Sequence, residues 1–237
     1  GETRLQLDLG YELDWARFRY RSDLVRDWVV DRWIVDTREL NVLLPFDIAD
    51  VKIGRQILTW GTGDLLFIND LFPKDWQSFF IGRDDEYLKS PSDAVKVSVF
   101  GDLANVDVVY TPRFDPDNSV DGERLSYWNP LLGRRAGEDD RFRYDAPDRY
   151  FDDDEIPLRV YRNLNGTELA LYGYRGFWKT PVGVDPLTGR GVYPKLSVYG
   201  ASARGKVAQG IGNVEVGYYD SRDDAGGEKR VDPRFGH

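Results

Sequence analysis

The opening of the chain alternates between apolar and polar residues. From residue 4 to residue 15, twelve positions in all, every second side chain is apolar. The apolar set is Leu5, Leu7, Leu9, Tyr11, Leu13 and Trp15. A period of two is the spacing of a β-strand, whose successive side chains point to opposite faces of a sheet. The length is close to the roughly 9 to 11 residues with which a tilted strand crosses a bilayer. The segment predicts a long strand, either of a membrane barrel or of a soluble sheet with one wet face.

The same alternation returns in four later stretches, each interrupted by turn residues. Hairpins are predicted over 40–53, 95–110, 158–178 and 196–219. Their turn signals are Asp47-Ile48-Ala49-Asp50, Gly101-Asp102, Asn165-Gly166 and Gly205-Lys206. Asn-Gly is the most specific of these signals, because both residues tolerate the positive φ of a type I′ turn. Segment 26–39 is apolar on both parities, so the pattern assigns no face to its side chains.

Summed along the chain, the pattern gives about ten strands and no amphipathic helix, which is typical of an all-β protein built from hairpins. Three connections are long, at 61–92, 112–156 and 179–193, and all are rich in Asp, Gly, Pro and Arg. Compact sandwiches rarely carry such loops. Outer-membrane barrels commonly do, on their outer side. The sequence therefore predicts an antiparallel transmembrane β-barrel with long outer loops.

Composition excludes several classes of function. The 237 residues include 41 acidic and 32 basic side chains, a net charge of -9, which argues against a nucleic-acid partner. There is no cysteine, so disulfides and thiolate metal sites are ruled out, and the one histidine is His237. No nucleophile elbow, phosphate-binding glycine loop or zinc motif occurs. We therefore expect neither an enzyme nor a cofactor.

Residues 51–75 contain a distinctive series of short motifs. They read Gly54-Arg55-Gln56, then Trp60-Gly61, then Asp64, Asn69-Asp70 and Pro73. This series resembles bacterial outer-membrane β-barrel proteins of the alginate-export and porin-like kind. The resemblance implies a channel in the bacterial outer membrane, in contact with membrane lipid. Residues 231–237 depart from it, because no closing strand ends there, so we expect residues 1–237 to be a single barrel domain that is incomplete at its C-terminus.

Segment 61–92 is the candidate for a structure that folds into the barrel lumen. It interleaves charged and aromatic side chains, and in a lumen such charges would select solutes. The candidate pore or substrate-binding residues are Lys52, Arg55, Asp64, Asp70, Lys74, Asp75, Arg83 and Lys89. Arg55 would need a β-bulge at Gly54 to turn inward, because it shares the parity of apolar Ile53. The alternative is a surface Ω-loop that packs its own aromatic residues.

A metal site is not expected, although one stretch echoes a calcium loop. Asp115, Asp117 and Asp121 stand at alternating positions, but Val120 occupies the place where an EF-hand needs glycine, and the last bidentate glutamate is missing.

Three functions compete. The first is an outer-membrane channel that passes small solutes through a charged lumen. The second is a structural barrel that holds a protein partner or forms an oligomer, and the third is a soluble β-sandwich that binds carbohydrate through Trp and Tyr. In a barrel, we expect a lipid-facing set and an interfacial aromatic set. The first set is Leu5, Leu7, Leu9, Leu13, Val214 and Val216, and the second is Trp15, Tyr110, Tyr218 and Tyr219.

Overall fold

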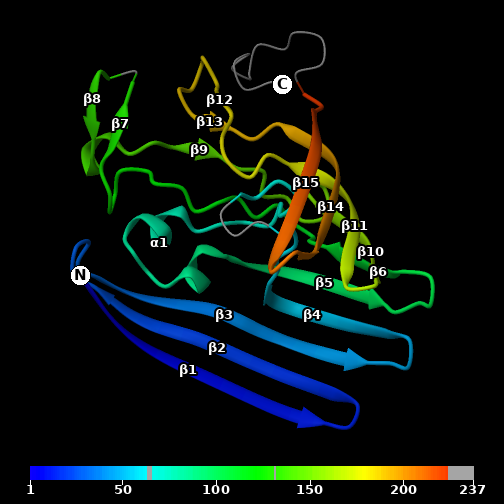
Figure 1. Ribbon diagram of the computed structural model, residues 1–237. Coiled ribbons are helices and arrows are strands. Elements are labelled where there is room, and N and C mark those ends of the chain that lie inside the picture. Colours follow the sequence, from blue (N-terminus) through cyan, green and yellow to red (C-terminus); the bar gives the residue numbers. More distant parts are fainter. Residues whose placement is uncertain (63–65, 131, 224–237) are drawn as a thin grey trace.

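A computed structural model describes residues 1–62, 66–130 and 132–223. Its main element is a curled ten-stranded antiparallel sheet in which every strand pairs with its neighbours in chain order (Figure 1). The strands are β1 (Glu2–Leu13), β2 (Ala16–Asp27), β3 (Arg32–Pro45), β4 (Ala49–Ile57), β5 (Pro91–Val99), β6 (Asn105–Tyr110), β10 (Ile156–Leu164), β11 (Thr167–Phe177), β14 (Lys195–Val207) and β15 (Gly210–Ser221). The all-β, antiparallel prediction is confirmed. Within the described residues no sheet closes into a barrel, and β1 and β15 are the sheet edges.

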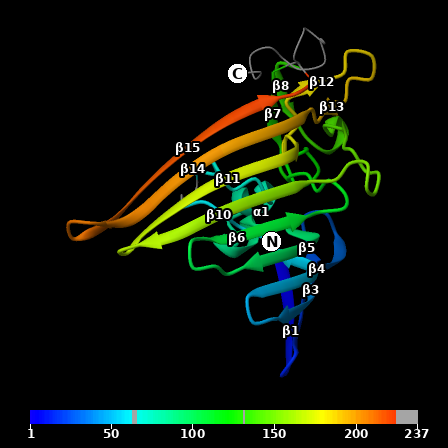
Figure 2. The same ribbon diagram turned by 90° about the vertical axis from the view of Figure 1, so that its right-hand side faces the viewer.

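The three long connections all leave the same end of the sheet, because they follow β4, β6 and β11, strands of the same direction (Figure 2). They contain the short elements α1 (Trp76–Phe80), η1 (Asp85–Leu88), β7 (Tyr127–Asn129), β8 (Arg134–Ala136), η2 (Glu138–Asp140), β9 (Tyr144–Asp145), β12 (Gly183–Val184) and β13 (Gly191–Val192). None of the described helices is long and apolar enough to cross a membrane.

Short hairpin turns occupy the opposite end of the sheet. The turn at Asn165-Gly166 is confirmed: its residues have φ of 54° and 85°, the positive values of a type I′ turn. The turn expected at Gly205-Lys206 is wrong, because β14 runs on to Val207 and the chain turns after it. A Cβ on Gly205 would lie 2.6 Å from the Thr167 hydroxyl oxygen, so this glycine permits close packing between strands.

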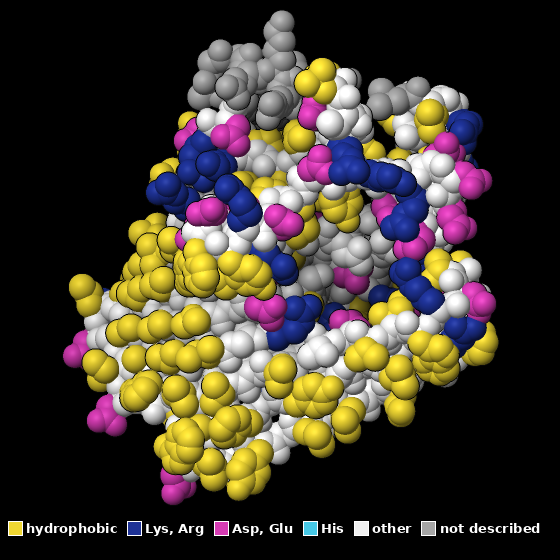
Figure 3. All heavy atoms as spheres, turned by 180° about the vertical axis from the view of Figure 1, so that it is seen from behind, with side chains coloured by type: hydrophobic (Ala, Val, Ile, Leu, Met, Phe, Trp, Pro, Cys, Tyr) yellow, Lys and Arg dark blue, Asp and Glu magenta, His cyan; other side chains and the backbone are white. Residues whose placement is uncertain are grey.

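One face of the sheet, here the apolar face, carries exposed aliphatic residues in rows that cross the strands. Val42 lies opposite Ile53, and Ile53 lies opposite Val95. Five of the six residues predicted to face outward on the two edge strands are exposed, from 50% at Leu7 to 68% at Leu5, whereas Leu13, at the end of β1, is half-buried. Figure 3 shows hydrophobic side chains in rows over the outside of the sheet. No second described sheet is hydrogen-bonded or stacked over this face as a sandwich requires.

A β-bulge in β3 explains why segment 26–39 had no consistent parity. Arg21 pairs with Glu39 and Ser22 pairs with Thr37, which leaves Arg38 as the extra residue. Apolar side chains before and after Arg38 therefore share a face although their parity differs.

β4 does not form, at Gly54, the bulge that was considered as a way to turn Arg55 inward. Pairing of β4 with both neighbours runs through Gly54 without a shift, and Arg55 stays in the row of Leu40 and Asp93. Gly54 has a φ of 114°, and a Cβ there would lie 2.4 Å from the Leu40 carbonyl oxygen. The glycine thus permits a close approach of backbones while the register stays intact.

The opposite face, here the polar face, carries ion pairs and is partly covered by the first long connection. Glu39 binds Arg19 at 3.0 Å, and Arg159 binds Glu168 at 2.6 Å. Phe72 packs there in a buried cluster that joins the connection to the sheet. The cluster is Leu58, Trp60, Phe72, Ala94, Val109, Ala170 and Tyr172.

Of the four predicted interfacial aromatic residues, Tyr219 is misplaced. Its hydroxyl donates to the Ile68 carbonyl, and its ring stacks on Trp178 with 5.6 Å between centroids. Because neighbours in a strand face opposite ways, exposed Tyr218 and half-buried Tyr219 cannot share one face. Trp15 is 63% exposed in the β1–β2 turn, and Tyr110 is half-buried at the end of β6.

Candidate functional site

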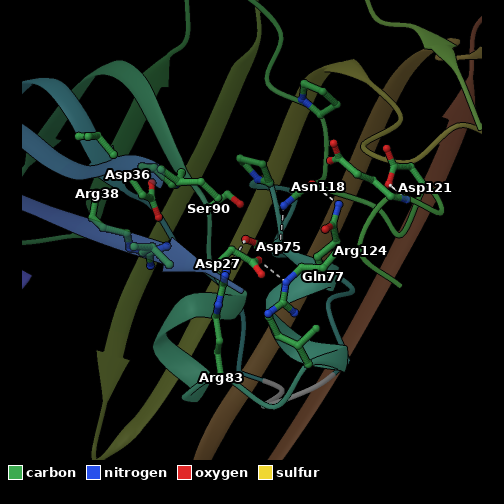
Figure 4. A pocket seen from close by; sticks show the side chains of 18 of the residues that line it. Asp27, Asp36, Arg38, Asp75, Gln77, Arg83, Ser90, Asn118, Asp121 and Arg124 are labelled. Atoms are coloured by element: carbon green, nitrogen blue, oxygen red, sulfur yellow. Dashed lines mark hydrogen bonds and ion pairs between the residues drawn. The ribbon is translucent and has the colours of Figure 1, made fainter. Parts of the chain in front are cut away.

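A charged cavity of about 480 Å³ lies where the long connections meet the ends of β1 to β4 (Figure 4). Its walls carry seven arginines and six acidic residues. The arginines are Arg4, Arg32, Arg38, Arg55, Arg83, Arg124 and Arg141, and the acids are Asp27, Asp36, Asp75, Asp115, Asp121 and Glu123. Figure 3 shows charged side chains gathered around a hollow. So dense a mixture of charges makes this cavity the candidate site.

Helix α1 brings the first long connection into the cavity wall. Asp75 caps the helix by accepting a hydrogen bond from the Ser78 amide at 2.8 Å. The same carboxylate accepts a hydrogen bond from the Asn118 side-chain amide at 3.0 Å. The backbone amide of Trp76 donates to the backbone carbonyl of Asn118, also at 3.0 Å. These bonds join the first connection to the second on one side of the cavity.

Glu2 in β1 is the centre of an ion-pair network. Arg83 binds it with two parallel hydrogen bonds, of 2.9 and 2.7 Å. Arg4 approaches it to 3.1 Å and Arg124 to 3.5 Å. Arg124 also donates to the buried Asp27 at the end of β2. The network ties β1 and β2 to the first and second long connections.

A second cavity, of about 630 Å³, lies on the other side of this network. The two cavities share Arg4, Ile81, Arg83 and Arg124 as lining residues. Arg83 and Arg124 therefore stand between two spaces, and their charges face both.

Arg38 differs from the other arginines of the cavity. Each of the other six has a carboxylate within ion-pair distance. Arg38 has none among the described residues, and its Nη2 donates instead to the carbonyls of Glu86 and Lys89, at 2.8 and 2.9 Å. The bulge in β3 puts this side chain against Tyr87, with 4.8 Å between guanidinium carbon and ring centroid.

Three of the predicted pore residues line the cavity together. They are Arg55, Asp75 and Arg83. Arg55 reaches it from β4, donating to the Thr37 carbonyl at 2.6 Å and pairing with Asp93 at 3.4 Å.

The remaining predicted pore residues lie elsewhere. Asp70 and Lys74 are buried as an ion pair of 3.2 Å, which braces the first connection, and burial lowers the pKa of Lys74. Lys52 pairs with Glu39 at 3.7 Å on the polar face, and Lys89 donates to the Thr59 hydroxyl at 2.6 Å. Asp64 lies outside the described residues.

The three aspartates considered as metal ligands do not converge. Asp117 accepts hydrogen bonds from the Lys74 amide and the Trp76 indole, both at 2.8 Å, and Asp121 pairs with Arg141. Asp115 lines the cavity, and burial raises its pKa. In the part of the chain that the structure describes, no three His, Cys, Asp or Glu side chains form a cluster that could hold a metal.

Sequence reasoning did not find several cavity residues. Glu2, Arg4 and Asp27 belong to strands, where periodicity reports the face of a side chain and not its distance from a loop. Arg124 comes from a connection whose path has no periodic signal. Arg38 did leave a trace: the loss of parity across 26–39 is the signature of a bulge, and bulges re-aim side chains near functional sites.

Comparison with known proteins does not supply a family. No family model matches the chain, and no curated protein matches it. The resemblance of residues 51–75 to outer-membrane barrel proteins therefore stays a prediction from the sequence.

Proposed function

We propose that this chain forms a β-barrel of the bacterial outer membrane and passes small solutes through a charged lumen. The observation that carries the proposal is the division of the ten-stranded sheet into an exposed apolar face and a polar face. In water, a continuous apolar surface of this extent is unfavourable and promotes association with other molecules. Against lipid, the same surface is what a spanning sheet requires.

Side chains on the polar face support the same proposal. Lys52, Lys96 and Asp107 lie in facing strands, with Lys96 and Asp107 3.6 Å apart. Within a membrane, charged side chains are tolerated where they face a water-filled lumen. The charged cavity continues this surface toward the long connections, so a solute would meet both signs of charge along its path.

The proposal requires the backbone groups of β1 and β15 to be paired in the membrane. The sheet has an even number of strands, so its two edge strands run in opposite directions. They can therefore pair with each other, or with further strands, in the antiparallel mode of bacterial barrels. The short turns would then face the periplasm and the long connections the outside.

A soluble sandwich fits the sheet less well. Its apolar face would be covered by a second sheet, whereas Leu5 and Val214 are 68% and 67% exposed.

Folding into lipid vesicles followed by conductance in planar bilayers tests the proposal. We expect the full chain to insert and to give discrete conductance steps. Insertion without conductance would contradict the channel, and failure to insert would contradict the barrel as well.

Leu7 and Gln6 offer a matched pair of variants for the insertion step. They are neighbours in β1 and face opposite ways. Leu7→Lys would put a charge into lipid at a cost of about 2–4 kcal/mol, whereas Gln6→Lys would put it on the polar face. We expect Leu7→Lys alone to reduce insertion; equal insertion of the two variants would contradict a lipid-facing Leu7.

A further inference from the structure

Arg38 is a buried cation whose charge no described carboxylate neutralises at ion-pair distance. Its side chain is 2% exposed, and its Nε is buried without a hydrogen-bond partner. The two carbonyls that accept from Nη2 are neutral groups. Removing a guanidinium from water is costly unless an anion compensates for it. A bound anionic group would complete this environment.

The position of Arg38 is set by the backbone. It is the extra residue of the β3 bulge, so it leaves the strand's alternation and reaches the cavity. Its stacking on Tyr87 and its bonds to the carbonyls of Glu86 and Lys89 hold the guanidinium in one orientation. Because Nη2 already donates to both carbonyls, a carboxylate would bind at Nη1, as a charge-assisted hydrogen-bonded pair with a fixed guanidinium.

Asp36 lies two residues away and lines the same cavity. It is half-buried, and no described lysine or arginine forms an ion pair with it. In Figure 4, Asp36, Arg38 and Ser90 lie on one side of the cavity, while Asp75, Asn118 and Arg124 lie across it. One wall thus presents an anion and a cation that attract each other without forming an ion pair within 4.0 Å, so each keeps room for an oppositely charged group of a ligand.

We propose that this wall binds an amphoteric solute, one that carries a carboxylate and an ammonium as an α-amino acid does. The carboxylate would bind Arg38 and the ammonium would bind Asp36. A simple anion would leave Asp36 without a partner, and a simple cation would leave Arg38 without one. The cavity volume of about 480 Å³ lies in the range typical of small-molecule sites. The inference rests on the proposed channel, because it names the class of solute that would pass.

Binding to the detergent-solubilised full chain tests the inference, with glycine, acetate and methylammonium as probes in titration calorimetry. Glycine should bind more tightly than either of the other two. Arg38→Lys keeps the charge but loses the planar fork, and Asp36→Asn removes the anion. Each should weaken glycine binding about tenfold, the effect of losing one charge-assisted hydrogen bond. Arg190→Lys, in an exposed pair outside the cavity, is the matched control and should bind glycine unchanged.

Several results would overturn the inference. They are acetate binding as tightly as glycine, absence of glycine binding, and wild-type affinity in Asp36→Asn. Circular dichroism checks the fold of each variant, and if Arg38→Lys misfolds, half-buried Asp36 carries the test. Conductance without glycine binding would overturn this inference alone, whereas glycine binding without conductance would overturn the channel and leave the site.

Discussion

Arg83 and Glu2 face each other as a bidentate pair, with hydrogen bonds of 2.9 and 2.7 Å that join the first long connection to β1. Arg83 lines the cavities on both sides of this pair, so in a channel its charge would lie beside the path of an ion. A unit charge about 4 Å from an ion is worth about 1 kcal/mol even in water. Arg83→Gln should therefore raise the cation-to-anion permeability ratio several-fold, measured from reversal potentials in a salt gradient.

Arg190→Gln is the control for this variant. Arg190 forms an exposed ion pair with Asp145 and does not line either cavity. It should leave the permeability ratio unchanged. Equal ratios in wild type and Arg83→Gln would place Arg83 away from the permeation path.

Gly54 and Gly10 should respond in opposite ways to alanine. At Gly54 the φ is 114° and a Cβ would collide with the Leu40 carbonyl, so Gly54→Ala should lower the free energy of unfolding by about 1–3 kcal/mol. At Gly10 a Cβ would meet nothing within 4 Å, and Gly10→Ala should raise it by about 0.4–1 kcal/mol. Urea unfolding in detergent measures both. A Gly54→Ala protein as stable as wild type would show that the close approach is readily relieved.

The strands were predictable where a segment is long and keeps one apolar face, as in β1, and not across 26–39, where the bulge at Arg38 changes the parity. Leu5 and Val214 are exposed on one face, as period two requires. Turns were predictable where the chemistry is specific, at Asn165-Gly166, and not at Gly205, whose glycine permits contact with Thr167. Closure of the sheet is a long-range property that alternation within single strands does not report.

The site was less predictable than the fold. Charge in segment 61–92 indicated Asp75 and Arg83 but equally indicated Lys74, which is buried in a brace. A run of charged residues does not indicate which of its members will form buried ion pairs and which will face a cavity. The partners of Arg83 and Arg124 come from β1 and β2, more than 80 residues away in the case of Glu2 and Arg83. Such pairings follow from packing of the connections, which has no local sequence signal.

Selectivity should depend on pH through Asp115, which lines the cavity. Burial raises the pKa of this carboxyl, and the nearby Lys179 ammonium partly opposes the rise. The group therefore takes up a proton at a higher pH than an ordinary aspartate, and the cavity becomes more positive as the pH falls. Anion permeability should rise over that range, measured from reversal potentials. Asp115→Asn should lose this part of the response; an unchanged profile would assign it to another group.

Glu155 and Lys179 form a buried ion pair at the base of the second and third connections. Glu155 is 2% exposed and accepts hydrogen bonds from the Lys179 ammonium at 2.6 and 2.8 Å, while Tyr174 donates to the same carboxylate. Lys179→Met would leave a buried carboxylate without its cation, which costs about 3–5 kcal/mol. Arg190→Met breaks an exposed pair and should cost less than about 1 kcal/mol.

The stability of the Lys179→Met protein should depend on pH differently from that of the wild type. Burial raises the pKa of Glu155, and Lys179 opposes that rise, so the variant should bind a proton more tightly when folded than when unfolded. Its stability should then increase as the pH falls from neutral toward the ordinary range of a glutamate, and the deficit relative to wild type should shrink. Urea unfolding at a series of pH values measures the difference. A deficit that stays constant over this range would mean that lost packing of the lysine stem, rather than the unpaired charge of Glu155, destabilises the variant.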